Sequence, residues 1–286
     1  MKIGIIGVNS LLGYELANKL IKKGYEPILY YHLDKSLCAH LPNLNKVSRI
    51  FKEKDFDFIF LISAKRIYED FNSGTQELWD GNIQLPYKII NKFTNSTIIF
   101  SSSIFIYEDS KFAIVENSNI KPKTLYNETK IAGEIMVKFA KKYQIIRFSS
   151  IYGFHQNIKT FLPIIIQNAM LNKEIYLFGK GERKQNYIHV SDAAEYMIRS
   201  MKLNHSNILL GVDIKSYSNK EVAKIIQKYT PCSIKYKGID NSLSVEYNNI
   251  VTQNLLNWAP KTTFETGISE IIATHKYNFN SLQSIE

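Results

Sequence analysis

One N-terminal segment decides the predicted fold: Lys2-Ile3-Gly4-Ile5-Ile6-Gly7-Val8-Asn9-Ser10-Leu11-Leu12-Gly13. It begins with a mostly apolar run, typical of a buried strand, and a helix with leucines at four-residue spacing follows. A strand, a glycine turn and a helix in this order form a phosphate-binding unit, because the helix N-terminus presents N–H groups and a positive dipole end to an anion. We therefore expect a dinucleotide to bind at this turn.

Two glycines of this segment occupy positions that such a unit requires. Gly7 would allow the tight turn after the strand, and Gly13 would let the helix pack closely on the sheet. Ser10 stands where a third glycine is expected, so its hydroxyl would lie near the pyrophosphate of the cofactor.

Further apolar runs alternate with amphipathic helical segments along the chain. The runs end near Tyr31, Ile62, Ser103 and Phe148, and Asn82 is expected to open one of the helices between them. This alternation predicts a Rossmann-type doubly wound parallel α/β sheet, in which ligands bind outside the carboxyl ends of the strands. A smaller C-terminal α/β part would bind the substrate.

The domain organisation that we expect divides the chain unevenly. A dinucleotide-binding domain would comprise residues 1–153 and a return segment of about 183–212, and the substrate domain residues 154–182 and 213–286. NAD-binding units often carry an acidic residue near the end of the second strand, where it binds the ribose 2′-hydroxyl. Here that end carries Tyr31, His32 and Lys35, which favours NADP(H) over NAD(H).

Composition excludes several classes of protein. The 286 residues are 45% hydrophobic and 22% charged, values typical of a globular protein, and no long apolar stretch predicts a membrane span. The net charge of +10 comes from scattered lysines rather than a basic stripe interleaved with aromatic residues, so we expect no nucleic-acid partner. Two cysteines are too few for a disulfide framework or a zinc site. We expect a cytoplasmic protein with no metal site.

A candidate proton-transfer pair lies at Tyr126 and Lys130, four residues apart and therefore on one helix face. A fixed ammonium beside a phenol favours the phenolate, so such a tyrosine could exchange protons with a substrate oxygen. The spacing Tyr-x-x-x-Lys occurs four times in this chain, but only this copy follows a strand that ends in serines and heads a long amphipathic helix. The stripe of Ile131, Ile135 and Phe139 predicts which face of that helix packs on the core.

Taken together, six ordered motifs resemble the extended short-chain dehydrogenase/reductases that act on nucleotide sugars. Besides the N-terminal turn, they are Ile62-Ser63-Ala64, Ser101-Ser102-Ser103-Ile104-Phe105-Ile106-Tyr107, Tyr126 with Lys130, Arg147-Phe148-Ser149-Ser150-Ile151-Tyr152-Gly153, and Gly179 to Asp192. A further match, Leu256-Asn257-Trp258-Ala259-Pro260, precedes the last predicted helix, so the resemblance covers nearly the whole chain.

The resemblance implies a role for each matching residue. Tyr126 would be the general acid/base, Lys130 would lower its pKa and hold the nicotinamide ribose, and Ser103 would bind the reacting oxygen. The cofactor, NADP or NAD, would contact Gly7, Asn9, Ser10, Leu11, Leu12, Gly13, Tyr31, His32, Lys35, Ser63, Ala64, Asn82, Ser101, Tyr126 and Lys130. A nucleotide-sugar substrate would contact Ser103, Ile104, Tyr126, Arg183, Lys184 and Gln185. The family further implies a homodimer packed through the helix that bears Tyr126.

Departures from the family pattern narrow the expected reaction. Dehydratases place an Asp-Glu pair where this chain has Ile104 and Phe105, and these side chains cannot move protons. Gln185 replaces an arginine that contacts the nucleotide diphosphate, which leaves Arg183 or Lys184 as substitutes. With dehydration excluded, the expected reaction is hydride transfer at one carbon of the sugar, C4. The chain is short for a 4-epimerase, so we expect a 4-keto sugar reductase; the alternatives are a nucleotide-sugar 4-epimerase and a non-catalytic NAD(P)-binding regulator.

Overall fold

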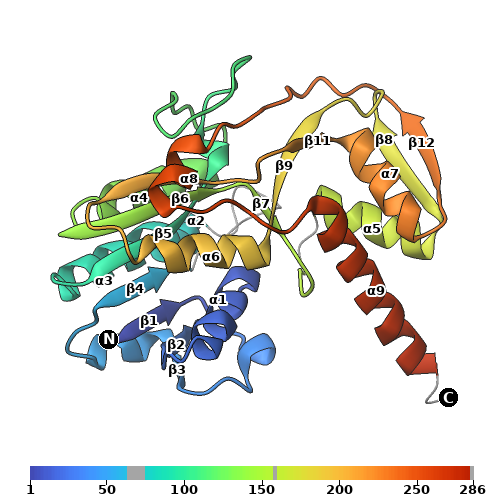
Figure 1. Ribbon diagram of the computed structural model, residues 1–286. Helices are drawn as coiled ribbons and strands as arrows, with labels where there is room; N and C mark the ends of the chain where they lie inside the picture. The colour runs from blue at the N-terminus through green and yellow to red at the C-terminus, as the bar shows by residue number, and fades with distance from the viewer. Residues whose placement is uncertain (63–74, 157–159, 284–286) are drawn as a thin grey trace.

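The computed structural model describes residues 1–62, 75–156 and 160–283, with side chains described up to residue 275. Two predicted cofactor contacts, Ser63 and Ala64, lie outside the described residues. Figure 1 shows a large parallel sheet between two layers of helices, with a smaller α/β part beside it.

All seven strands of the large sheet are parallel to their neighbours, in the order β10-β6-β5-β4-β1-β2-β3. Their bounds are β1 Ile3–Ile6, β2 Ile28–Tyr31, β3 Leu44–Lys46, β4 Phe58–Leu61, β5 Thr97–Ser103, β6 Lys142–Phe148 and β10 Asn207–Gly211. The chain proceeds outward from β1 to β3, then returns to β4 on the other side of β1. This reversal creates a crevice at the carboxyl ends of β1 and β4, where ligands of open α/β sheets bind.

Helices cover both faces of this sheet, as the doubly wound fold requires (Figure 1). Helices α1 (Leu11–Lys22) and α6 (Val190–Ser200) pack together over one face. Helices α2 (Thr75–Trp79), α3 (Leu85–Lys92) and α4 (Leu125–Val137) cover the other. Because both faces are covered, the strands are apolar on both sides, which confirms the predicted fold class.

The smaller part has an apolar core of its own. It lies among α5 (Phe161–Leu171), α7 (Asn219–Tyr229), α9 (Phe264–Gln283) and a pair of parallel strands, β8 (Glu174–Phe178) and β12 (Ser233–Lys237). A three-stranded sheet connects this part with the large one, and α8 (Ile250–Leu256) packs near α6 and β10. The strands of the connecting sheet are β7 (Ser150–Tyr152), β9 (Lys184–His189) and β11 (Ser216–Ser218).

The predicted core-facing stripe of α4 is wrong. Ile131 is only half-buried, and the side chains of Ile135 and Phe139 are 48% and 77% exposed. The buried side of the helix is instead largely polar, because it faces the strand ends that form the site. It consists of Asn127, Thr129, Lys130, Gly133, Glu134 and Val137.

The predicted helix start at Asn82 is also wrong. A π-helical turn, Asp80–Gln84, joins α2 to α3 and places the residue mid-way along the helical segment. Such turns widen a helix locally and are frequent at functional sites.

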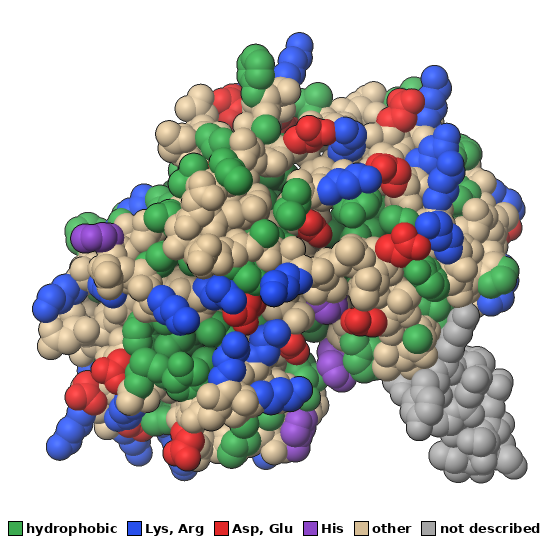
Figure 2. Space-filling view, viewed as in Figure 1, with side chains coloured by type: hydrophobic (Ala, Val, Ile, Leu, Met, Phe, Trp, Pro, Cys, Tyr) green, Lys and Arg blue, Asp and Glu red, His purple; other side chains and the backbone are tan. Residues whose placement is uncertain are grey.

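On the surface shown in Figure 2, lysine and arginine side chains are dispersed among acidic and uncharged ones. None of the described helices combines the length and apolar composition that a transmembrane segment needs. The described residues also contain no cluster of three potential metal-ligating side chains.

Candidate active site

The turn between β1 and α1 has the geometry of a dinucleotide cradle. Gly7 has a φ of 95°, a conformation that side chains disfavour. A Cβ atom on Gly13 would lie 2.1 Å from the carbonyl oxygen of Gly7, so only glycine permits this approach of helix to turn. Asn9, Leu11 and Leu12 lie between the two glycines, and the first turn of α1 points toward the crevice at the strand ends.

Ser10 fits this turn without strain. Its φ of −90° and ψ of 159° are ordinary extended values, so the position does not require glycine. The hydroxyl is the N-cap of α1: it accepts from the Gly13 N–H at 3.0 Å and donates to the Gly7 carbonyl at 2.7 Å. These bonds fix the turn in the shape that a pyrophosphate would contact. The cradle therefore fits the expected cofactor despite the missing glycine.

No acidic residue stands at the end of β2 itself, and the first one after the strand is Asp34. Tyr31 is half-buried, whereas His32 and Lys35 are exposed. The nearby carboxylate of Asp34 accepts from the backbone N–H and the hydroxyl of Ser36, and these bonds lower its pKa. The predicted cofactor contacts in this region, Tyr31, His32 and Lys35, therefore lie at the end of β2 or within four residues of it.

Three predicted catalytic residues meet at the crevice. Ser103 ends β5, and Tyr126 lies in the first turn of α4, one turn before Lys130. Thr124 caps this helix by accepting from the Asn127 N–H at 3.2 Å. All three predicted residues line a cavity of about 390 Å³, which is also lined by Ser10, Leu11, Leu12 and Ser101 of the cofactor set.

Lys130 is held beneath the cavity. Its side chain is 2% exposed, and Nζ donates to the carbonyl oxygen of Ser101 at 2.6 Å. The ammonium also lies 4.3 Å from the centre of the Phe100 ring. Ser103 accepts from the Phe105 N–H at 3.2 Å, which leaves its hydroxyl hydrogen available to a substrate oxygen.

Asn82 supports α4 rather than opening into the described cavity. Its buried side chain donates to the Thr129 hydroxyl at 2.9 Å, and that hydroxyl donates to the carbonyl oxygen of Tyr126 at 2.8 Å. A Cβ atom on Gly133 would lie 2.6 Å from the Asn82 carbonyl oxygen. The π-helical turn thus packs directly against α4.

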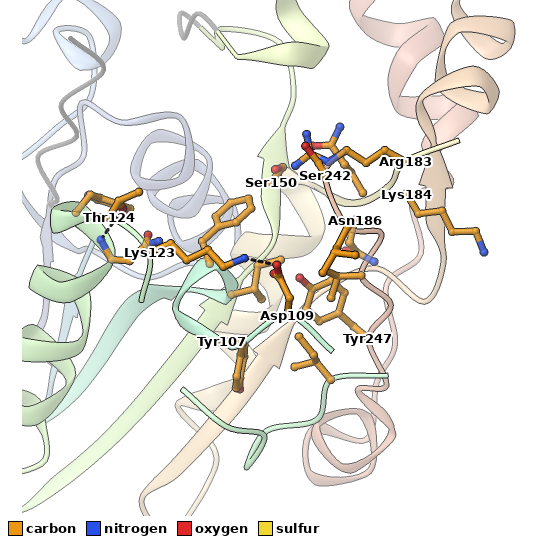
Figure 3. A pocket seen from close by; sticks show the side chains of 18 of the residues that line it. Tyr107, Asp109, Lys123, Thr124, Ser150, Arg183, Lys184, Asn186, Ser242 and Tyr247 are labelled. Carbon is orange, nitrogen blue, oxygen red and sulfur yellow. Dashed lines mark hydrogen bonds and ion pairs between the residues drawn. The ribbon is translucent and has the colours of Figure 1, made fainter. Parts of the chain in front are cut away.

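A second, larger cavity of about 910 Å³ shares Tyr126, Ser150, Arg183 and Gln185 with the first. Figure 3 shows its walls: the segment from Tyr107 to Thr124, strand β9, and a segment near Ser242 to Tyr247. Lys123 forms an ion pair with Asp109 across one side of this cavity. Ile104 and Phe105 also line this larger cavity. Of the predicted substrate residues, only Ser103 is absent from its lining, and Ser103 lines the smaller cavity instead.

The three predicted phosphate-binding candidates differ in their partners. Lys184 pairs with Glu246 at 2.6 Å and extends away from the cavity, and the Gln185 amide donates to Asn219 at 2.8 Å. Arg183 has a buried Nε with no hydrogen-bond partner among the described residues. Its guanidinium lies near Ser150 and Ser242 in Figure 3.

A buried polar network beneath the site escaped the sequence analysis. Arg147 on β6 forms a bidentate ion pair with Glu134 of α4, and it donates to the Tyr107 hydroxyl at 2.7 Å. Burial disfavours its charge, but the bonds and charge of Glu134 raise the pKa of Arg147 overall. Burial also raises the pKa of Tyr107 to about 12, against the pull of the guanidinium. The sequence offered one indication of this network: Arg147 stands within an otherwise largely apolar strand, where a charged side chain needs a buried partner.

The comparisons with known proteins agree with this geometry. The chain belongs to the NAD-dependent epimerase/dehydratase family, whose model matches residues 3–209. Over 96% of each chain it is 22% identical to a UDP-glucose 4-epimerase of Lactobacillus helveticus. It is 23% identical to a dTDP-glucose 4,6-dehydratase of Haemophilus influenzae, over 84% of this chain and 82% of that protein.

Among solved structures, a UDP-glucuronic acid 4-epimerase of Bacillus cereus in complex with UDP-glucuronic acid and NAD has a TM-score of 0.84. The match covers 97% of this chain and all of that one at 15% identity, so it supports the fold. The predicted membership of the extended nucleotide-sugar dehydrogenase/reductases is confirmed.

Proposed function

We propose that this protein is an NAD-dependent epimerase that inverts C4 of a nucleotide-activated sugar. One observation carries the proposal: Ser103, Tyr126 and Lys130 line the same cavity as Ser10, Leu11 and Leu12 of the β1–α1 turn, where the cofactor would bind. A relative described as a UDP-glucose 4-epimerase matches 96% of the chain, and this supports the epimerase over the reductase that we expected from the sequence.

The side chains divide the chemistry between them. NAD, when bound by the β1–α1 turn and Lys130, supplies a hydride acceptor and donor. Tyr126 would take the proton of the sugar hydroxyl and return it to the oxygen of the transient 4-ketone. Ser103 would donate a hydrogen bond to that oxygen, and the buried ammonium of Lys130 would favour the phenolate of Tyr126.

The cavity disfavours a dehydratase. Elimination at neighbouring carbons needs further proton-transfer groups, yet Ile104 and Phe105 line the cavity beside Ser103. The carboxylate of Asp109, which also lines it, is paired with Lys123. Tyr126 therefore remains the proton-transfer group best suited to a single carbon.

Inversion requires the 4-ketone to present its other face to the same hydride, so the sugar must turn within the cavity. The 910 Å³ space next to Tyr126 is far larger than a hexose ring. Our length argument for a reductase also loses force, because the chain spans 96% of a UDP-glucose 4-epimerase.

We assign the nucleotide diphosphate to Arg183. Its side chain lines both cavities, its buried Nε has no hydrogen-bond partner in the part of the chain that the structure describes, and a guanidinium binds phosphate oxygens in a bidentate manner. Lys184 and Gln185 already have protein partners, Glu246 and Asn219. Arg183 stands at the start of the return segment of about 183–212, so the diphosphate would bind where this segment adjoins the proposed substrate domain of residues 154–182 and 213–286.

A 4-keto sugar reductase is the second candidate, and the end of β2 favours it. Tyr31, His32 and Lys35 offer no carboxylate to the ribose, and Asp34 is engaged by Ser36. This arrangement suits NADP(H), which a reductase would consume. A non-catalytic regulator would bind a dinucleotide without turnover.

We further propose a homodimer formed through α4. Ile135 on α4 and Phe139, two residues beyond its C-terminal end, are exposed, and the helices that contact α4 expose Trp79 and Tyr87. Large apolar side chains grouped on neighbouring helices are typical of an interface, and a second copy would cover them.

The proposed function is tested by denaturing the purified protein and identifying the released nucleotide. NAD in near-equal amount is expected from an epimerase that recycles its cofactor. A protein that is empty and prefers NADPH would support the reductase instead. A protein that binds neither dinucleotide would contradict both enzymatic proposals.

A further inference from the structure

Two oppositely charged side chains lie four residues apart on the buried side of α4. Lys130 is 2% exposed and Glu134 is 1% exposed. Lysine and glutamate at this spacing face each other on a helix and readily form an ion pair. Their attraction is stronger in a buried environment than in water, because the effective dielectric constant is lower.

The structure engages Glu134 elsewhere. Its Oε1 accepts from Arg147 Nε at 2.9 Å and from the Ser102 hydroxyl at 2.6 Å, and its Oε2 accepts from Arg147 Nη2 at 2.7 Å. Lys130 Nζ instead donates to the carbonyl oxygen of Ser101, at the end of β5. The carboxylate is therefore directed to β6 and the ammonium to the strand that carries Ser103.

Arg147 is itself held from the opposite side. Its Nη1 donates to the Tyr107 hydroxyl at 2.7 Å and to the Glu116 carbonyl oxygen at 3.0 Å. The guanidinium also lies 4.8 Å from the centre of the Tyr107 ring. Anchored by a strand and by the loop after β5, this side chain holds the carboxylate in one direction.

We propose that Arg147, with Ser102, prevents Glu134 from capturing the ammonium of Lys130, and that Arg147 is thereby a positioning residue for the catalytic lysine. The inference rests on the proposed function, in which Lys130 acts on Tyr126 and the cofactor. Removal of the guanidinium leaves an uncompensated carboxylate one helical turn from Lys130. The ammonium then turns toward it and away from the cavity.

A purely structural role for the Glu134–Arg147 pair makes a different prediction. In that case Arg147→Met lowers stability because the Glu134 carboxylate is left uncompensated, and neutralising Glu134 restores stability, while the folded single variant keeps the kcat and NAD affinity of the wild type. If Glu134 competes for Lys130, the folded single variant itself loses kcat and NAD affinity, and neutralising Glu134 restores both. Measurements of kcat and NAD affinity per folded protein, beside urea denaturation, therefore separate the two accounts.

The experiment compares Arg147→Met with the double variant Glu134→Gln/Arg147→Met, in which the amide oxygen of the new glutamine can still accept from Ser102. For Arg147→Met we expect kcat for sugar epimerisation to fall at least about 100-fold, the scale of general acid–base catalysis. Affinity for NAD, measured by titration, should weaken as well. In the double variant kcat should recover at least about tenfold, together with NAD affinity.

Arg199→Met is the matched control, because it removes another arginine from an ion pair, with Glu195, and both of these partly exposed side chains lie outside the lining of the two cavities. It should leave kcat and NAD affinity unchanged. Circular dichroism establishes folding; if Arg147→Met does not fold, Arg147→Gln, which is also uncharged but keeps a side-chain donor for the Tyr107 hydroxyl, replaces it in both variants.

Two failures can be told apart. A wild-type protein that epimerises no nucleotide sugar contradicts the proposed function before any variant is made. An active wild type, with a folded double variant as slow and as weak in NAD binding as the single one, overturns the role of Arg147.

Discussion

The two faces of helix α4 differ in a way that hydrophobic patterns do not predict. The inward face presents Lys130, Glu134 and Thr129, each bonded to a group on β5, β6 or the π-helical turn. The outward face exposes Ile135, and Phe139 is exposed just beyond the end of the helix. Buried polar side chains are tolerated where each has a partner, and here the partners lie at the strand ends that form the site. The helix is thus organised around the site on one side and a proposed second copy on the other.

The largest expected effect belongs to the inward face, at Tyr126. Tyr126→Phe removes the proton-transfer group, so kcat for sugar epimerisation should fall about 10²- to 10⁴-fold. Affinity for NAD should change little, because the cradle at Gly7 to Gly13 is untouched. Tyr87→Phe, an exposed tyrosine on α3, is the control and should retain full activity. Equal activity of the two variants would contradict catalysis by the inward face.

The outward face should decide assembly rather than folding. Ile135→Asp/Phe139→Asp places two charges in the proposed interface, and we expect self-association to weaken at least about 100-fold, since buried apolar contacts are lost in both copies. Light scattering after size exclusion measures this. Leu33→Asp, a substitution at another exposed apolar residue, is the control and should leave the molar mass of the assembly in solution unchanged. A dimer that survives the double substitution would show that α4 does not form it.

Gly133 tests the close contact between the inward face and the π-helical turn. Gly133→Ala places a Cβ atom 2.6 Å from the Asn82 carbonyl oxygen and 3.1 Å from the Phe100 ring. The helix must shift, and we expect a loss of about 1–3 kcal/mol in the free energy of unfolding. Urea denaturation measures it. Glu128→Ala, exposed on the same helix, should stay within about 0.5 kcal/mol. Equal stability of the two variants would show that the contact is not tight.

The smallest effect is expected at the start of α4. Thr124→Ala removes the acceptor of the Asn127 N–H and should lower the free energy of unfolding by about 1 kcal/mol. Thr124→Ser keeps the hydroxyl and should retain nearly all of the stability. If both variants unfold at the same urea concentration, the cap does not stabilise this helix.

The sequence predicted most of the fold and the centre of the site, because both depend on local signals. Apolar runs marked the strands, and parallel strands bring their carboxyl ends together, so Gly7 and Ser103 were expected at one edge. Tyr126 was expected in the site from its spacing to Lys130 and from the family resemblance. The face of α4 was predicted wrongly, since the partners of Lys130 and Glu134 come from distant strands. Long-range packing, which no local sequence pattern predicts, determines two further features. One is the wall of the larger cavity near Ser242, and the other is the set of partners of Arg183, Lys184 and Gln185.

The most direct test of the central claim follows product and cofactor in one sample. Protein with NAD and UDP-glucose, or another UDP-hexose, is analysed for the C4 epimer by chromatography while absorbance at about 340 nm, the reduced nicotinamide band, is recorded. An epimerase that recycles its hydride at C4 should form the epimer with no net absorbance change, and Tyr126→Phe should form almost none. Product that appears only from a 4-keto sugar, with equal loss of NADPH, would contradict the epimerase and establish the reductase.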